Sequence, residues 1–252
     1  MITHCILLSS SYFQGIRIAI DYCIEDMNAE EYLINRIKDI MNQCGKDVSI
    51  STHYIQTKSK EWKSVYEKDS FFKEVKLIDT TEEFIKLIKQ DRTFLGIDVA
   101  KYILSKVKCT HLKLEKLVYL CYADYLCNTQ EKLFEDNIYA FRYGPVIDSV
   151  YERYKIYGCD TIEEKECEDD KYIDSLDILE MPSKSRLLFA ISGVDKCNSI
   201  DKTLAKYGHY TAGKLIDITH KKNSPWELTY TGEEYKLILD ETISKYHKFE
   251  NI

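Results

Sequence analysis

Histidine and cysteine are the residues of this chain whose chemistry could serve catalysis or metal binding. The six histidines form no HExxH motif and show no His/Cys spacing typical of a zinc site, and the nine cysteines contain no CxxC pair. The nine glycines are scattered and occur in neither GxGxxG nor GxxxxGK, so no phosphate-binding loop is expected. We therefore predict no catalytic residue, no metal site and no cofactor.

Three residue positions allow a functional and a structural interpretation. His220 could act as a general base, but no nucleophile or orienting acid is identifiable beside it, so we favour a residue that caps or braces the end of its helix. Trp226 follows Ser224 and Pro225 and could be an exposed anchor for a partner; a ring that pins its loop to the core is the favoured alternative. Cys121 and Cys127 lie six residues apart in an apolar stretch, which favours core packing over metal binding.

The composition narrows the class of protein. The chain has 252 residues and a formal charge of −7, which argues against a general binder of nucleic acid or of anionic membranes. An odd number of cysteines within apolar stripes indicates reduced, buried thiols. There is no apolar run of 18 residues and no signal peptide at the start, so we expect a soluble, cytoplasmic protein without a membrane partner.

Tyrosine is the one residue type in excess. The chain contains 20 tyrosines, and tyrosine is favoured at protein interfaces because it combines a large contact area with a polar tip. An AT-rich genome, which favours Tyr, Ile, Lys and Asn codons, explains the same excess. Both explanations stay open.

The stretch 110–127 is predicted to be the central helix that positions the rest. Leu114, Leu117, Val118, Cys121 and Tyr125 have helical spacing, and further apolar residues widen the stripe. Thr110 is the expected N-cap. The narrow polar face, formed by Lys113, Glu115, Lys116 and Asp124, is predicted to point to water.

Residues 1–92 are predicted to form a small α/β module. The expected order is strand, two helices, two strands and a short helix, with Gly45 as the left-handed end of the second helix. The first helix is expected over 16–27 from the spacing of its apolar residues, and Asn28 with Glu31 resembles a capping pair for the second. The strands are expected at 3–8, 48–55 and 74–78, and a capping box at Thr80 and Glu83 starts the last helix. The segment 57–72 is not assigned.

Residues 93–252 are predicted to be mainly helical, which makes the fold class α+β. Within 134–142 a short extended run is expected, after which Gly144 supplies a permissive backbone and Pro145 suits the first turn of a helix ending at Gly158. The acidic run 163–170 is expected to be a solvated loop. Further helices are expected around 187–191, 200–207 and 212–219, and a capping box at Thr231 and Glu234 is expected to open the last one.

Three landmarks in chain order resemble the SocA-like antitoxin family, also called the Panacea domain and including the phage-associated GepA-like proteins. The first is the run LEKLVYL within 114–126, and the second is FRYGPV at 141–146 followed by SVY at 149–151. The third is Tyr207-Gly208, then Leu215, then Thr219-His220 and Ser224-Pro225-Trp226. Together they cover about residues 96–235, and Glu115 stands where the family has glutamine.

The resemblance implies an all-helical domain over 93–252 that neutralises a protein toxin by direct binding, with no enzymatic activity. The motif residues Tyr143, Gly144, Pro145, His220, Pro225 and Trp226 are expected to be structural, and the contact surface is unknown. The alternatives are a phage-borne anti-defence protein, an adaptor to a protease, and an enzyme acting on a small molecule at His220. A homodimer is left open, as is the role of residues 1–92.

Overall fold

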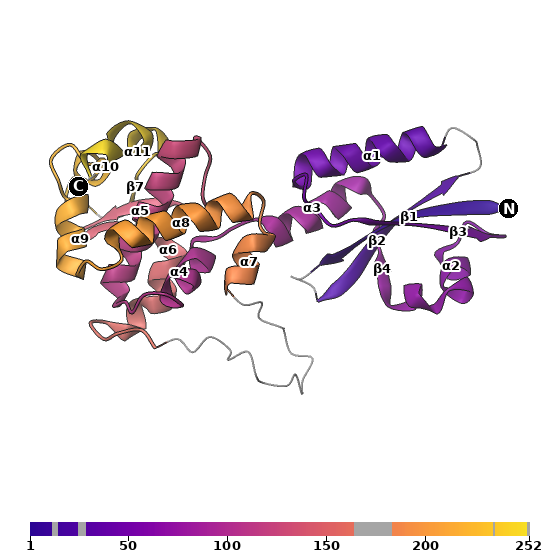
Figure 1. Ribbon diagram of the computed structural model, residues 1–252, viewed down its shortest axis with the longest axis horizontal. Helices are drawn as coiled ribbons and strands as arrows, with labels where there is room; N and C mark the ends of the chain where they lie inside the picture. The colour runs from indigo at the N-terminus through magenta and orange to yellow at the C-terminus, as the bar shows by residue number, and fades with distance from the viewer. Residues whose placement is uncertain (12–14, 25–28, 164–182, 234, 251–252) are drawn as a thin grey trace. The chain divides into compact units, whose positions relative to one another are not determined.

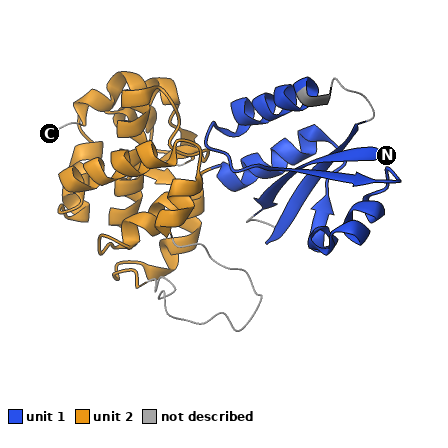
Figure 2. Ribbon diagram, turned by 45° about the vertical axis from the view of Figure 1, so that its right-hand side comes forward, with its two compact units in different colours: residues 1–93, 176–179 blue, residues 94–175, 180–252 orange. Residues whose placement is uncertain are grey.

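A computed structural model describes residues 1–11, 15–24, 29–163, 183–233 and 235–250. The chain divides into two compact units, which Figure 2 shows in different colours. Unit 1 comprises residues 1–93, and unit 2 comprises residues 94–175 and 180–252. No helix among the described residues is long and apolar enough to cross a membrane.

Unit 1 is a four-stranded sheet with helices packed on it. Its elements are β1 (Ile2–Ser11), β2 (Ile16–Ile24), α1 (Ala29–Cys44), β3 (Ser51–Thr57), α2 (Trp62–Lys68), the 3₁₀ turn η1 (Ser70–Glu74), β4 (Val75–Leu77) and α3 (Thr81–Arg92). The strand order is β3-β1-β2-β4; β1 runs antiparallel to both neighbours, and β4 is parallel to β2.

Helices cover both faces of this sheet, and this explains why the sequence predicts a helix where the second strand lies. Leu7, Ile18 and Ile20 face the helices α1 and α3, whereas Ile6 and Ala19 face α2 and η1 (Figure 1). Three consecutive residues of β2, Ile18 to Ile20, are therefore buried. Ala19 and Cys23 on the second face are apolar and give the segment helical spacing together with Ile16 and Ile20, which explains the incorrect prediction. The predicted helix over 16–27 is wrong: residues 16–24 are a strand.

Other local signals in unit 1 are confirmed. The Thr80 side chain accepts a hydrogen bond from the Glu83 amide at the start of α3. Gly45 follows α1 with a φ of 102°, a backbone angle that glycine adopts readily. The predicted strand at 74–78 corresponds to β4, and the unassigned segment 57–72 contains α2. Asn28 of the predicted capping pair lies outside the described residues.

Unit 2 is built around one buried helix. Its elements are α4 (Gly96–Leu104), α5 (His111–Thr129), β5 (Ile138–Phe141), β6 (Gly144–Ile147), α6 (Asp148–Tyr154), η2 (Lys155–Tyr157), α7 (Ser183–Phe189), α8 (Gly193–Tyr207), α9 (Ala212–Thr219), α10 (Pro225–Thr229), β7 (Lys236–Leu237), α11 (Asp240–Tyr246) and η3 (His247–Phe249). Helix α5 contacts α4, α6, α8, α9, α11 and β6, which confirms it as the central helix. Thr110 caps it by accepting a hydrogen bond from the Lys113 amide.

Three expectations for unit 2 need correction. Pro145 is not in the first turn of a helix; it lies in β6, paired with Ala140 of β5, and helix α6 begins only at Asp148. Thr231 does not open the last helix, because β7 intervenes and α11 begins at Asp240. The domain that the resemblance describes as all-helical therefore carries a three-stranded sheet of order β6-β5-β7. The acidic run from residue 164 onward lies outside the described residues.

A buried polar network ties the end of the described chain to α5. His247 is joined by hydrogen bonds of 2.6 Å to Glu250 and 2.8 Å to Asp124, and the Tyr119 hydroxyl donates to Glu250 at 2.9 Å. Burial alone lowers the pKa of His247, but the two carboxylates outweigh this effect and raise it to about 9. The imidazole is therefore a cation at neutral pH, paired on both sides.

The cysteines divide into buried and exposed groups. Cys5, Cys44, Cys109, Cys121 and Cys197 are buried, Cys127 is half-buried, and Cys23 and Cys159 are exposed. Within the described ranges no disulfide joins them. Burial raises the pKa of Cys5 and of Cys109 to about 11, so these thiols stay protonated at neutral pH.

Candidate functional site

The three sequence landmarks meet at two buried residues of opposite charge on helix α5. Glu115 and Lys116 are 1% and 0% exposed, respectively. The Lys116 ammonium donates a hydrogen bond of 2.6 Å to the Pro145 carbonyl, and Glu115 Oε2 accepts one of 3.0 Å from the Ile147 amide. The prediction that these two residues face water is wrong, because both side chains are buried and their hydrogen bonds join α5 to strand β6.

Burial dominates the electrostatics of this pair. It raises the pKa of the Glu115 carboxyl and lowers the pKa of the Lys116 ammonium, while the attraction between the two groups opposes both changes. A charged pair and a pair in which the proton has moved to Glu115 both have zero net charge. The core therefore avoids a single unpaired charge, which would be costly to bury.

Gly144 has no side chain, and Lys116 occupies the space that a side chain at this position would fill. Its φ is 109°, and a Cβ atom at this position would lie 2.8 Å from Lys116 Cε and 3.1 Å from Thr219 Oγ1. The expectation that a glycine is needed here is confirmed for two reasons, the backbone angle and the close approach of Lys116. Gly144 thereby links the second landmark to both the first and the third.

His220 and Trp226, which belong to the third landmark, form another side of the same cluster. The imidazole of His220, the C-cap residue of α9, stacks on the indole with 3.5 Å between ring centroids and an angle of 4°. The indole N–H donates a hydrogen bond of 2.7 Å to the Phe141 carbonyl, and this ties the loop to strand β5. Ser224 and Pro225 are buried at the start of α10, where the Ser224 hydroxyl donates to the Thr219 carbonyl at 2.7 Å.

The protonation state of His220 does not suit a general base at neutral pH. Burial, assisted by the positive charge of Lys116, lowers its pKa to about 4. A base is most effective when its pKa lies near the working pH, so an imidazole with this pKa is weak at pH 7. Its position favours the role of a brace between α9 and Trp226.

Three nitrogen and oxygen atoms of this cluster are buried without a hydrogen-bond partner among the described residues. They are Nε2 of His220, Nε2 of His111 and Oε1 of Glu115. His111 Nε2 lies 3.8 Å from Glu115 Oε1, and the His111 ring contacts Tyr151 with a centroid distance of 5.1 Å. Burial and the charge of Lys116 lower the pKa of His111, so this imidazole is also neutral at pH 7.

Five of the six residues singled out in the sequence lie in or beside this cluster. Gly144 and Pro145 contact Lys116, and Pro225 and Trp226 close the cluster around His220. Tyr143 differs: it is 58% exposed, with the Arg142 guanidinium 5.5 Å from its ring centre. Sequence reasoning placed Glu115 and Lys116 on a face directed at water and gave Thr219 no place in a site, although the two charged residues interrupt the apolar stripe of the central helix.

A row of aromatic rings runs from the buried Phe141 to the exposed Tyr235 beside the cluster. Tyr235, which is 56% exposed, contacts Phe141 and Tyr139 with centroid distances of 4.7 Å and 5.8 Å. Phe141 also contacts Tyr151 at 5.4 Å. We call Tyr139, Phe141, Tyr151 and Tyr235 the hairpin face, because two of them belong to the β5–β6 hairpin; Tyr143 lies at its turn.

Comparisons with known proteins agree with the landmarks. Residues 114–227 match the family model described as "Antitoxin SocA-like, Panacea domain". "Antitoxin SocA" from Caulobacter vibrioides (strain NA1000 / CB15N) is 23% identical over 164 residues, covering 61% of this chain and 82% of that protein. No solved structure matches the chain. Residues 114–227 of unit 2 are therefore similar to the SocA-like Panacea domain of antitoxins.

Proposed function

We propose that this protein is the antitoxin of a toxin–antitoxin or mobile-element system and neutralises a protein toxin by direct binding in the cytoplasm. The matched family model and the name of its relative support an antitoxin role. The observation that carries direct binding is a pair of exposed tyrosines beside the motif cluster, Tyr235 on the hairpin face and Tyr143 at the hairpin turn. Exposed tyrosines are common anchors of protein interfaces.

The motif cluster itself is not the proposed contact surface. Glu115, Lys116 and Thr219 are buried; the first two form hydrogen bonds that join α5 to β6, and the Thr219 hydroxyl donates to the Ile216 carbonyl within α9. Buried residues of this kind stabilise the neighbouring surface but do not contact a partner themselves. Tyr143 and Tyr235 are the exposed aromatic residues next to them, so we assign toxin contact to these two side chains first.

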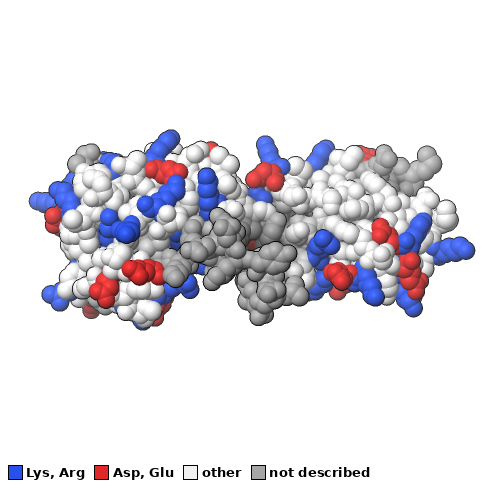
Figure 3. Space-filling view, turned by 60° about the horizontal axis from the view of Figure 1, so that its bottom comes forward, with Lys and Arg blue, Asp and Glu red and all other residues white. Residues whose placement is uncertain are grey.

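The charge distribution fits a protein partner better than a nucleic acid. On the face shown in Figure 3, basic and acidic side chains are interspersed on both units. A surface that follows a phosphate backbone needs clustered lysine and arginine, and the formal charge of the whole chain is −7.

Co-expression with a candidate toxin tests this proposal. Antitoxins are usually encoded beside their toxins, so the product of the neighbouring open reading frame is the candidate. We expect the full chain to restore growth and to co-purify with the toxin. Failure of both with a toxic neighbour would contradict the proposal.

Surface variants locate the contact. Tyr143→Ser combined with Tyr235→Ser is expected to abolish rescue while leaving the circular dichroism melt unchanged. Tyr54→Ser is the matched control, because Tyr54 is 61% exposed on strand β3 of unit 1. Rescue by the double variant at normal expression would show that the hairpin face is not the contact.

We further propose that unit 1 contributes to partner selection, because it lies outside the matched residues 114–227. The test is expression of residues 94–252 with the toxin. Full rescue by this shorter chain would contradict partner selection. Loss of rescue supports it when circular dichroism shows that the shorter chain is folded.

A further inference from the structure

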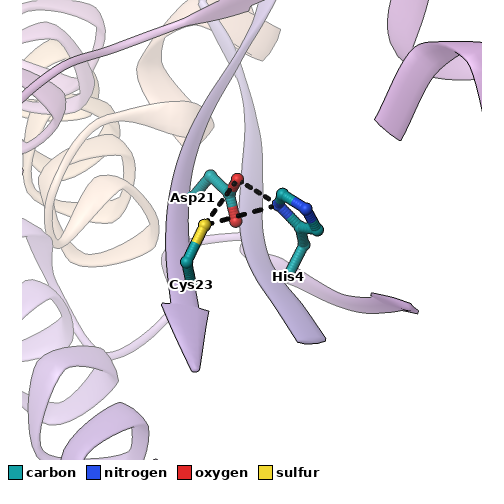
Figure 4. Close-up of side chains that lie close together, drawn as sticks. All are labelled: His4, Asp21 and Cys23. Atoms are coloured by element: carbon teal, nitrogen blue, oxygen red, sulfur yellow. Dashed lines mark hydrogen bonds and ion pairs between the residues drawn. The ribbon is translucent and has the colours of Figure 1, made fainter. Parts of the chain in front are cut away.

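Three side chains with metal-binding atoms converge at one end of the sheet of unit 1. His4 belongs to β1, and Asp21 and Cys23 belong to β2; His4 pairs directly with Cys23 in the antiparallel register, so both side chains lie on the same face. Asp21 precedes Cys23 by two residues and shares this face. Cys23 Sγ lies 3.6 Å from His4 Nδ1 and 3.7 Å from Asp21 Oδ2, and Figure 4 shows the three groups turned toward one another.

The surroundings of His4 orient its ring toward the other two residues. Its Nε2 atom lies 2.9 Å from the Ser59 carbonyl oxygen and 3.0 Å from Thr57 Oγ1. A carbonyl oxygen only accepts hydrogen bonds, so Nε2 carries a proton and Nδ1 is the atom directed at Asp21 and Cys23. Metal-binding histidines are commonly held in this way, with the second ring nitrogen donating to a backbone carbonyl.

Asp21 provides an independent sign of a missing partner. Its side chain is 7% exposed, and its Oδ1 atom is buried without a hydrogen-bond partner among the residues described. The other oxygen lies 2.6 Å from His4 Nδ1. A cation at this point would offset the cost of burying the carboxylate.

We propose that His4 Nδ1, the Asp21 carboxylate and the Cys23 thiolate bind a divalent ion of the zinc class. Two ligands on a tetrahedral zinc ion, at bond lengths near 2.0 and 2.3 Å, lie about 3.5 Å apart, which is close to the two sulfur distances here. The 2.6 Å contact between His4 and Asp21 opens when the ion replaces the shared proton. A water molecule is the fourth ligand of the ion, because Cys23 is exposed and solvent can reach the site.

The ligand set favours zinc over calcium or magnesium. Calcium and magnesium prefer oxygen ligands, whereas thiolate and imidazole together select zinc and related ions. Binding releases the Cys23 thiol proton and the proton shared by His4 and Asp21 to solvent. Uptake is therefore expected to weaken as the pH falls.

Cobalt(II) titration of the full, reduced, metal-free chain tests this site, since thiolate-bound cobalt has a charge-transfer band in the near ultraviolet. We expect one equivalent to bind and zinc to displace it. Cys23→Ser is expected to remove the band, whereas Cys159→Ser, which changes the other exposed cysteine among the described residues, is expected to keep it. No stoichiometric uptake by the full chain, or an unchanged band in the Cys23→Ser variant, would overturn the proposal.

An isosteric variant distinguishes the loss of a metal ligand from misfolding as the cause of lost binding. Asp21→Asn keeps the shape of the side chain and removes its charge, and we expect zinc affinity to fall at least about tenfold. Zinc is also expected to raise the melting temperature of the full chain and of the Cys159→Ser variant, but not that of Asp21→Asn. Equal zinc affinity in Asp21→Asn and the full chain would count against Asp21 as a ligand and overturn the proposed ligand set.

Discussion

Two buried basic residues, Lys116 of unit 2 and Arg92 of unit 1, differ in how accessible their partners are to water. In unit 2, Glu115 and Lys116 are both enclosed, and each forms a hydrogen bond with the backbone of β6. In unit 1, the guanidinium of Arg92 is buried but pairs at 2.6 Å with Asp47, whose side chain is 62% exposed. Water can reach the partner in unit 1 and not in unit 2. A lost interaction is therefore expected to cost more in unit 2.

Lys116→Ala should have the largest effect on stability. It leaves Glu115 buried without its cation and removes the donor to Pro145, so unit 2 is expected to lose about 3–5 kcal/mol of unfolding free energy. Urea unfolding followed by Trp226 fluorescence measures this, in a Trp62→Phe background, because the chain has two tryptophans and one lies in each unit.

Lys106→Ala is the matched control for this lysine. Lys106 pairs with Asp201 at 2.6 Å, and both side chains are more than a third exposed, so the expected cost is below about 1 kcal/mol. Equal costs for the two variants would remove the distinction between enclosed and accessible charges.

The stability of unit 2 should fall as the pH rises above neutrality. The pKa of His247 is about 9 in the folded chain, above the 6.5 of an unperturbed histidine. Its contribution is therefore complete below about pH 6.5 and is lost as the pH passes 9, a total of about 3 kcal/mol. Unfolding free energies between pH 6.5 and 9.5 measure the slope.

The variant His247→Gln isolates this titration. A glutamine can still form hydrogen bonds to Asp124 or Glu250 but does not titrate in this range, so its slope over the same pH range should be flatter. Identical slopes would exclude His247 as the source of the pH dependence.

Gly144→Ala should cost less than the loss of the lysine. The strained φ of 109° contributes about 1–3 kcal/mol, and the contact with Lys116 adds to it. Gly158→Ala is the matched control, because Gly158 also has a positive φ, of 50°, but nothing lies within 4 Å of its added Cβ. Thermal melts of both variants compare strain with and without the close approach. A Gly144 variant no worse than the Gly158 variant would contradict the role of Lys116.

Trp226→Phe should give the smallest effect of this series. The change keeps an aromatic ring for His220 to stack on and removes the hydrogen bond to the Phe141 carbonyl, which corresponds to about 1 kcal/mol. Circular dichroism melts measure it. A loss of toxin neutralisation without a loss of stability would instead identify Trp226 as a contact residue.

Local sequence signals predicted much of the fold. The central helix and the caps at Thr110 and Thr80 depend on residues a few positions apart, and all three are confirmed. Strand β2 was missed because its neighbours on both faces come from distant parts of the chain. The apolar residues of β2 fit helical spacing as well as strand alternation, because Ala19 and Cys23 lie between Ile16, Ile20 and Ile24 in the sequence.

The candidate site shows the same limit. Its landmark residues could be named from the sequence, whereas the burial of Glu115 and Lys116 could not, because their partners in β6 lie about 30 residues away. A charged residue is normally taken to face water, and only the folded backbone supplies the groups that allow it inside. His4 and Cys23 were not connected for a similar reason: strand pairing brings them together across 19 residues.

Because the cysteines differ in accessibility, one cysteine in each unit can be labelled selectively with a fluorescent dye. Cys5 and Cys109, whose pKa values are raised to about 11, hold almost no thiolate at neutral pH and should react slowly with maleimides. Cys23 on unit 1 and Cys159 on unit 2 are exposed. Once Cys167 is replaced by serine, a donor and an acceptor dye can be attached to this pair. Energy transfer between the dyes would then report whether the distance between these two cysteines changes when a toxin binds.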